Sequence, residues 1–187
     1  MKYEPTETLT WSANGVTMSQ AMCAALLEFA SYDDARPMLC GVAISDGCLA
    51  ATDGHSLLRY DSPACGKEFN HRRVWSRAHV ERALKVAKLD KADVTLLFAD
   101  LDHCAMFPTI AQVIPEPGFG KGKSHKQEPV ALNPEYLARM VKVCKALGNR
   151  GCLLTSMRGD LDAVMYSIRG LKCCDVNATV VIMPMRY

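Results

Sequence analysis

Apolar residues recur with a helical period in three stretches of the chain, at residues 18–29, 77–89 and 136–147. Within each stretch they fall three or four positions apart, which is typical of a helix that buries one face. Short runs rich in Val, Ile, Leu and Thr lie between these stretches, and such runs are typical of strands. The pattern therefore predicts three helices separated by groups of strands.

Polar residues mark where the predicted helices begin. Thr17 or Ser19 can cap the first helix, and Ser76 can cap the second. Asn133 can cap the third helix, with Pro134 at its first position. Extended segments are expected at residues 8–11, 38–44, 48–59, 73–75, 94–99, 103–107, 129–132, 152–157, 162–168 and 178–183.

The order of strand, helix and further strands recurs three times along the chain. Such a repeat predicts an α+β architecture of three βαβββ modules, in which helices cover one face of continuous antiparallel sheets. Residues 117–128 contain Pro, Gly and Lys in the proportions of a flexible linker. We therefore expect a domain of two modules at residues 1–116 and a half-domain with the third module at residues 129–187.

The composition favours an ordinary globular protein, with 187 residues of which 49% are hydrophobic. No apolar run approaches the roughly 18 residues of a membrane span, and the N-terminus has no signal-peptide pattern, so we expect a cytoplasmic protein without a membrane partner. Nine cysteines without a Cys-x-x-Cys pair do not form a disulfide framework or zinc ribbon. His103 with Cys104, and Cys173 with Cys174, could contribute metal ligands, but we expect no metal and no cofactor.

The net charge of +2 is too small for a globally basic nucleic-acid binder, so any DNA-binding charge must be gathered on one surface. Two predicted helices carry basic residues every three positions, which places them on one helix face. These residues are Arg82, Lys85 and Lys88, with Arg77 nearby, and Arg139, Lys142 and Lys145. The first helix carries Glu28 and no cation. Two interpretations stay open, a solvated face and a surface for DNA phosphates.

Two short segments near opposite ends of the chain have the composition of a docking surface. Asp53 and Gly54 provide a tight turn between two apolar segments. At the other end, Pro184 stops an apolar strand, and Met183 and Met185 flank it. Flexible Met side chains suit a surface that accepts varied apolar partners, although a last core strand is the alternative interpretation.

Four segments resemble the bacterial DNA polymerase III beta subunit, the sliding clamp, and they follow that family's order. They are Thr-Asp-Gly-His-Ser-Leu at residues 52–57, Phe-Pro-Thr-Ile-Ala-Gln-Val-Ile-Pro at residues 107–115, Met-Pro-Met-Arg at residues 183–186 and Arg-Pro-Met-Leu-Cys-Gly-Val at residues 36–42. The resemblance implies the DNA-clamp fold, a ring of twelve βαβββ modules with helices inside and sheets outside. Residues 9–115 resemble the middle domain of that clamp, and residues 129–187 resemble the second half of its last domain.

The resemblance also implies a hydrophobic cleft that receives short linear motifs of partner proteins. Carried over position by position, its lining comprises Arg36, Leu39, Thr52, Gly54, His55, Leu57, Pro108, Val113, Val181, Met183, Pro184, Met185 and Arg186. Two positions depart from the family: Ser56 replaces a basic residue, and residues 109–112 replace a more polar run. We expect the apolar floor to be retained and the polar rim to be altered.

The resemblance implies a DNA sliding clamp that encircles duplex DNA without sequence preference and tethers DNA polymerase and clamp-loader subunits. With three modules per chain, twelve modules require four chains, so a homo-tetramer is the expected oligomer and its symmetry stays open. The alternative is a clamp-derived interaction protein that binds clamp-binding motifs or a host clamp without encircling DNA. His55 lies next to Asp53, but no nucleophile motif accompanies them, so we do not expect an enzyme.

Overall fold

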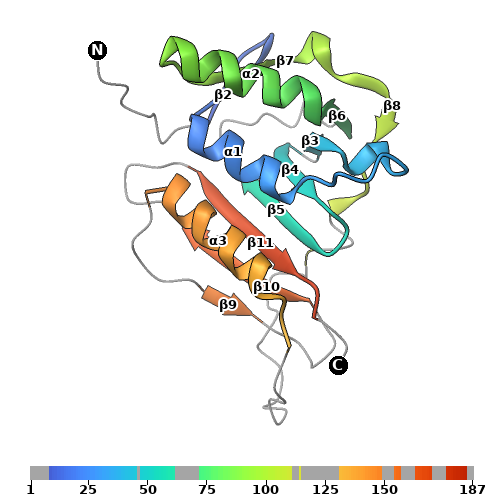
Figure 1. The fold of residues 1–187 in the computed structure, drawn as a ribbon, viewed down its shortest axis with the longest axis vertical. Coiled ribbons are helices and arrows are strands. Elements are labelled where there is room, and N and C mark those ends of the chain that lie inside the picture. Colours follow the sequence, from blue (N-terminus) through green and yellow to red (C-terminus); the bar gives the residue numbers. More distant parts are fainter. Residues whose placement is uncertain are drawn as a thin grey trace.

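The computed structural model describes residues 9–45, 47–61, 72–110, 114, 131–148, 154–156, 163–169 and 176–184. Within these residues the helices lie on one side of an extended antiparallel sheet (Figure 1). The elements are β1 (Thr10–Trp11), β2 (Gly15–Met18), α1 (Gln20–Phe29), η1 (Pro37–Leu39), β3 (Gly41–Ser45), β4 (Cys48–Thr52), β5 (Ser56–Asp61), β6 (Arg73–Ser76), α2 (Arg77–Asp90), β7 (Val94–Leu97), η2 (Phe98–Asp100), β8 (Asp102–Met106), α3 (Pro134–Ala146), β9 (Leu154–Ser156), β10 (Val164–Arg169) and β11 (Asn177–Ile182). The α+β class predicted from the sequence is confirmed.

The three helices begin at the predicted caps. Ser19 Oγ accepts a hydrogen bond from the Met22 backbone N–H, and Ser76 Oγ accepts one from the His79 backbone N–H. The Asn133 side chain accepts a hydrogen bond in the first turn of α3. Each cap satisfies a backbone donor that has no partner within the helix. Of the two caps left open for the first helix, Ser19 is therefore the one that is used.

The residues just before α1 form a strand that the sequence pattern did not predict. Residue 18 was expected to open the helix, but it ends β2, which pairs with β1 on one side and β7 on the other. The predicted extended segment at residues 48–59 is two strands, β4 and β5, on either side of the turn at Asp53 and Gly54. The segment expected at residues 94–99 ends early in the short helix η2.

The strands form two sheets within the described residues. One has the order β1-β2-β7, and the other has the order β8-β6-β3-β4-β5-β11-β10-β9. Strand β5 pairs with β11 over six residues, so the C-terminal strands continue the sheet that the first two predicted modules begin. This pairing places the turn before β5 next to the chain segment that follows β11.

The large sheet has apolar side chains on both faces, because alternate residues of a strand point to opposite sides. On β5, Leu58 and Tyr60 face the main core under the helices, whereas Leu57 belongs to a second cluster on the other face. On β11, Val180 faces the main core and Val181 faces the second cluster. Among the described elements, the three α-helices lie over the first face, where α1 packs against both α2 and α3, as Figure 1 shows.

Candidate functional site

The second apolar cluster lies on the sheet face opposite the helices. Its buried members are Leu39, Ala43, Cys48, Ala50, Leu57, Val74, Phe107, Ile110 and Val181, with Ile114, Ala163 and Met165 packed against it. Two chain segments outside the strands contribute to it, η1 through Leu39 and the segment after β8 through Phe107 and Ile110. We call this set the outer cluster.

Three residues predicted for the cleft floor meet in the outer cluster. Leu57 and Val181 are direct partners in the β5–β11 register, and Leu39 packs from η1. All three are buried, with exposed fractions of 7% or less. The structure therefore brings together residues from three distant parts of the sequence that the resemblance had assigned to one floor.

The remaining predicted cleft residues surround this floor or lie outside the described part of the chain. Met183 is 43% exposed directly after β11, and Pro184 is half-buried. Thr52 is half-buried at the end of β4, and four residues are exposed: Arg36, Gly54, His55 and Pro108. Val113, Met185 and Arg186 lie outside the described residues.

The turn between β4 and β5 is held by the side chain of Asp53. Its Oδ1 atom accepts hydrogen bonds from the backbone N–H groups of His55 at 2.9 Å and Ser56 at 2.8 Å. Burial by itself raises the pKa of this carboxyl, but these N–H donors and the Arg139 guanidinium outweigh it and hold the pKa below its ordinary value. The turn therefore contains a carboxylate that is charged at neutral pH.

The backbone conformation of this turn favours glycine at position 54. Gly54 has a φ of +93°, which side-chain-bearing residues rarely adopt. A Cβ atom there would lie 3.1 Å from Nη1 of Arg36, whose Nε is bound to Asp33 Oδ2 at 2.8 Å. The exposed guanidinium of Arg36 therefore lies against the turn.

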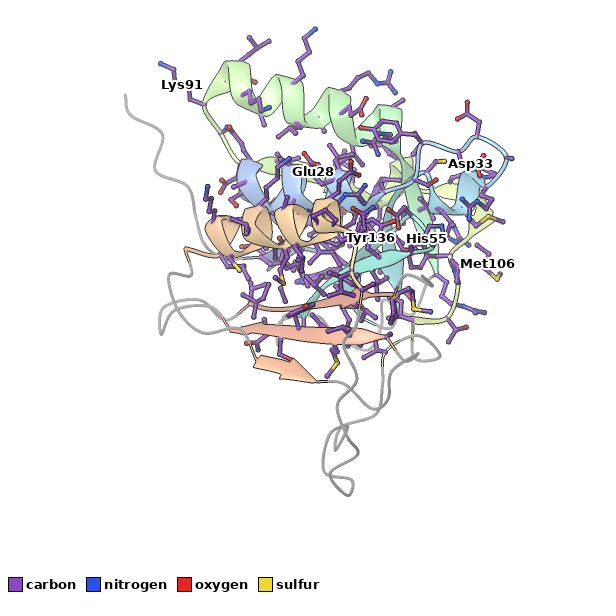
Figure 2. All side chains as sticks on the ribbon, turned by 60° about the horizontal axis from the view of Figure 1, so that its bottom comes forward. Glu28, Asp33, His55, Lys91, Met106 and Tyr136 are labelled. Atoms are coloured by element: carbon purple, nitrogen blue, oxygen red, sulfur yellow. The ribbon has the colours of Figure 1, made fainter. Side chains whose placement is uncertain are left out.

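Arg139, which the sequence pattern predicted to face DNA, binds this turn. Its Nη1 atom lies 2.6 Å from Asp53 Oδ2 and 3.3 Å from Ser56 Oγ. Figure 2 shows the start of α3, marked by Tyr136, against the turn that carries His55. The sequence contained no signal for this contact, because 86 positions separate Arg139 from Asp53.

Arg77, the first residue of α2, is also engaged within the protein. Its Nη1 atom donates to the carbonyl oxygens of Leu27 and Ala30, each at 3.0 Å, at the C-terminal end of α1. Its guanidinium carbon lies 3.5 Å from the centre of the Tyr32 ring, and its Nε pairs with Glu81. With 13% of its side chain exposed, Arg77 satisfies helix-end carbonyls and has little surface for a DNA phosphate.

The other cations predicted to face DNA are more exposed to solvent than Arg77 and Arg139. Arg82, Lys85, Lys88 and Lys145 are exposed, and within the described residues none of them forms an ion pair. Lys142 Nζ lies 2.6 Å from Glu28 Oε1 on α1, and both side chains are about half exposed. The available positive charge therefore concentrates on α2 and on the C-terminal half of α3.

A cavity of about 370 Å³ lies beside the start of α2. Tyr32, Cys40, Arg77, Glu81 and Asp102 are among its lining residues. None of the residues predicted for the cleft lines it, although Val74 of the outer cluster does.

The described part of the chain offers neither a reactive thiolate among Cys23, Cys40 and Cys144 nor a group of side chains suited to a metal ion. Burial raises the pKa of the Cys23 thiol to about 12 and also raises the pKa of Cys40 and Cys144, so these thiols are protonated at neutral pH. Within the described residues, His, Cys, Asp and Glu do not gather in a group of three that could hold a metal. The side chains of His103 and Cys104, and residues 173–174, lie outside that part. The helices described are too short or too polar to cross a membrane.

The arrangement of helices over one face and a continuous sheet over the other is the fold of a bacterial DNA sliding clamp. The beta sliding clamp of C. crescentus superimposes with a TM-score of 0.60 at 15% identity, covering 94% of this chain and 66% of that one. The DNA polymerase III subunit beta of Pseudomonas aeruginosa gives a TM-score of 0.61 at 14% identity, covering 94% and 67%. A structure of the Pseudomonas aeruginosa clamp bound to griselimycin gives 0.57 at 14% identity, covering 95% and 67%.

The likeness is one of structure, not of close sequence. No protein-family model and no curated protein matches the chain. The chain spans about two thirds of the length of the clamps it superimposes on. The fold expected from four short segments is therefore confirmed for a shortened clamp-like chain.

Proposed function

We propose that this chain is a shortened DNA sliding clamp, a non-enzymatic cytoplasmic protein that encircles duplex DNA as a homo-oligomer and tethers DNA polymerase and other replication or repair proteins. The observation that carries the proposal is the division of the molecule into two faces. Four of the cations predicted to face DNA, Arg82, Lys85, Lys88 and Lys145, are exposed on the helices, and the outer cluster lies on the opposite face of the sheet. DNA and a protein partner can therefore be bound at the same time.

The helix face suits weak contact with DNA phosphates. Arg82, Lys85 and Lys88 are exposed along α2, and Lys145 is exposed on α3. A single charge pair in water contributes about 1 kcal/mol, so a few such contacts attract DNA without fixing one position along it. Retention in a clamp comes from the closed ring, which makes weak contacts sufficient.

The surface beside the outer cluster, where Met183 is exposed, suits a short apolar segment of a partner. Its floor includes Leu57 and Val181, and Met183 is exposed directly beside it. A flexible thioether side chain adapts to different apolar groups, and exposed apolar surface gains about 25 cal/mol per Å² when a partner covers it. We infer that Leu or Phe side chains of a peptide pack here, with Arg36 and His55 at the rim.

Oligomerisation follows from the number of modules. Three modules per chain require four chains for a ring of twelve, and a tetramer is the form we propose. Among the described strands, β8 and β9 are the edges of the large sheet, and β1 and β7 are the edges of the small one. Edge strands present unpaired backbone groups, which a neighbouring chain can satisfy.

Retention on circular DNA tests the clamp function. The protein is mixed with a nicked plasmid, and the bound fraction is measured by gel filtration before and after the plasmid is cut once. A clamp stays on the circle in moderate salt and is lost when the ends appear. Arg82→Gln/Lys85→Gln/Lys88→Gln lowers the loaded fraction, and the matched control is Arg59→Gln, which removes a cation paired with Asp61 on β5.

A second candidate function is an interaction protein that binds clamp-binding motifs without encircling DNA. The engagement of Arg77 and Arg139 inside the protein favours it, because it leaves fewer cations for DNA. This protein would bind a peptide ending in Leu-Phe but would show equal retention on circular and linear DNA. Griselimycin, which the Pseudomonas aeruginosa clamp binds, is a second probe for the docking surface.

A further inference from the structure

The turn between β4 and β5 connects three parts of the molecule. Asp53 uses Oδ1 for the backbone of its own turn and Oδ2 for Arg139 on α3, at 2.6 Å. On the other side, the His55 carbonyl oxygen accepts a hydrogen bond from the Met183 backbone N–H at 2.9 Å. One carboxylate therefore joins α3 to the turn, and the turn joins to the segment that follows β11.

The Asp53–Arg139 pair is sheltered from water. The two side chains are 16% and 23% exposed, which is less than the exposed fractions of the Lys142–Glu28 pair on the same helix, 57% and 41%. A charge-assisted hydrogen bond with limited solvent access is stronger than one at the open surface. Of the two ion pairs that α3 makes with other described residues, the Asp53 pair is therefore the stronger attachment.

Arg139 makes its two hydrogen bonds to the turn through Nη1, and one face of its guanidinium lies over an aromatic ring. Besides Asp53 it lies 3.3 Å from Ser56 Oγ, and its guanidinium carbon is 5.0 Å from the centre of the Tyr136 ring. Ser56 is itself buried, with an exposed fraction of 2%. These contacts orient the guanidinium of Arg139 toward the turn between β4 and β5.

We propose that Arg139 is a positioning residue of the docking surface, whose ion pair with Asp53 fixes the turn at residues 52–56 and, through His55, the exposed Met183. The inference rests on the proposed docking function. Asp53 keeps its bonds to the turn backbone when Arg139 is removed, so the turn survives locally but loses its attachment to α3. Met183 then occupies several positions, and a peptide must select one of them when it binds.

Peptide affinity in a double-mutant cycle tests the proposal. The probe is a fluorescein-labelled octapeptide ending in Leu-Phe, and its Kd is measured by anisotropy with the full chain. Arg139→Gln and Asp53→Asn are each expected to weaken binding about tenfold, and the double variant is expected to be no weaker than either, because both remove one interaction. Arg139→Lys restores part of the affinity, since it keeps the charge but not the forked donor geometry.

The matched control is Glu28→Gln. It also changes an acid to its amide and breaks the other ion pair of α3, with Lys142, but it leaves the turn intact. Its Kd is expected to stay within twofold of the unsubstituted chain. Urea unfolding of each variant shows that the peptide is measured against folded protein.

Hydrogen exchange at the Met183 amide provides a second readout without peptide. This amide is bound to His55 O, so it is expected to exchange faster in Arg139→Gln than in Glu28→Gln. A folded Arg139→Gln protein with unchanged Kd and unchanged exchange would overturn the positioning role. If the unsubstituted chain fails to bind the peptide, the docking function itself is rejected, and the inference is rejected with it.

Discussion

Leu57 on β5 and Val181 on β11 face each other across the strand pair that joins the C-terminal strands to the rest of the sheet. Both side chains are buried on the face away from the helices. The same pairing that completes the sheet therefore also builds the floor of the proposed docking surface. In the proposed function, folding of the C-terminal strands and partner binding therefore depend on one set of contacts.

The exposed Met183 is expected to contribute to binding and little to stability. Met183→Ala removes an apolar side chain that is 43% exposed, so the free energy of unfolding should change by less than about 1 kcal/mol. The Kd for the Leu-Phe peptide should rise about tenfold, measured by anisotropy. Leu97→Ala, which trims a 46% exposed side chain on β7, is the matched control and should leave the Kd unchanged. Equal effects of the two variants would contradict the placement of the docking surface.

Arg77 is expected to behave as a structural residue. Arg77→Met leaves the carbonyl groups of Leu27 and Ala30 without their donor and should lower the free energy of unfolding by about 1–3 kcal/mol in urea. Arg82→Met should change stability by less than about 0.5 kcal/mol, since that side chain is exposed, but should weaken DNA binding. If folded Arg77→Met loses as much DNA affinity as Arg82→Met, Arg77 contacts DNA and the purely structural role is wrong.

The Asp53 carboxyl should make stability depend on pH in the acid range. Its pKa is lower in the folded protein than its ordinary value of 3.8, so the folded state favours the charged form. The stabilisation is complete above 3.8 and is lost as the pH falls through the lower, folded pKa. Urea unfolding at a series of pH values should show a stability advantage over Asp53→Asn at neutral pH that shrinks on acidification. A constant difference across that range would exclude the charged contact.

The buried hydroxyl group of Tyr60 is expected to destabilise the folded protein. Its Oη atom is buried in the main core without a hydrogen-bond partner in the described part of the chain, and burial raises the pKa of the phenol. Tyr60→Phe removes an unsatisfied polar group and should raise the free energy of unfolding by about 1 kcal/mol. Tyr32→Phe is the control, because Tyr32 is 77% exposed. A destabilised Tyr60→Phe protein would show that the hydroxyl has a partner.

Local patterns predicted the helices well because their signals lie within a few residues of each other. Ser19, Ser76 and Asn133 cap the helices as their positions before apolar runs indicated. Strand β2 escaped prediction because it has only four residues, Gly15–Met18, and runs directly into the helix cap, so Met18 also fits the helical spacing that follows. Its buried positions depend on pairing with β7, which comes much later in the chain.

The sequence could indicate a residue's place in the candidate site only where that place follows from the polarity of the residue itself. Leu39, Leu57 and Val181 are apolar, and the structure packs them in one cluster. The roles of Arg77 and Arg139 depend on partners 47–50 and 83–86 positions away, so their helical spacing suggested a DNA surface that the structure fills with internal contacts. Charge periodicity marks a helix face but does not show what packs against it.

The solution mass tests the central claim most directly. Light scattering across a concentration series is expected to give a stable species of about four chains, because three modules per chain complete a twelve-module ring only as a tetramer. A chain that stays monomeric or dimeric at every concentration would contradict the encircling clamp and favour the motif-binding alternative.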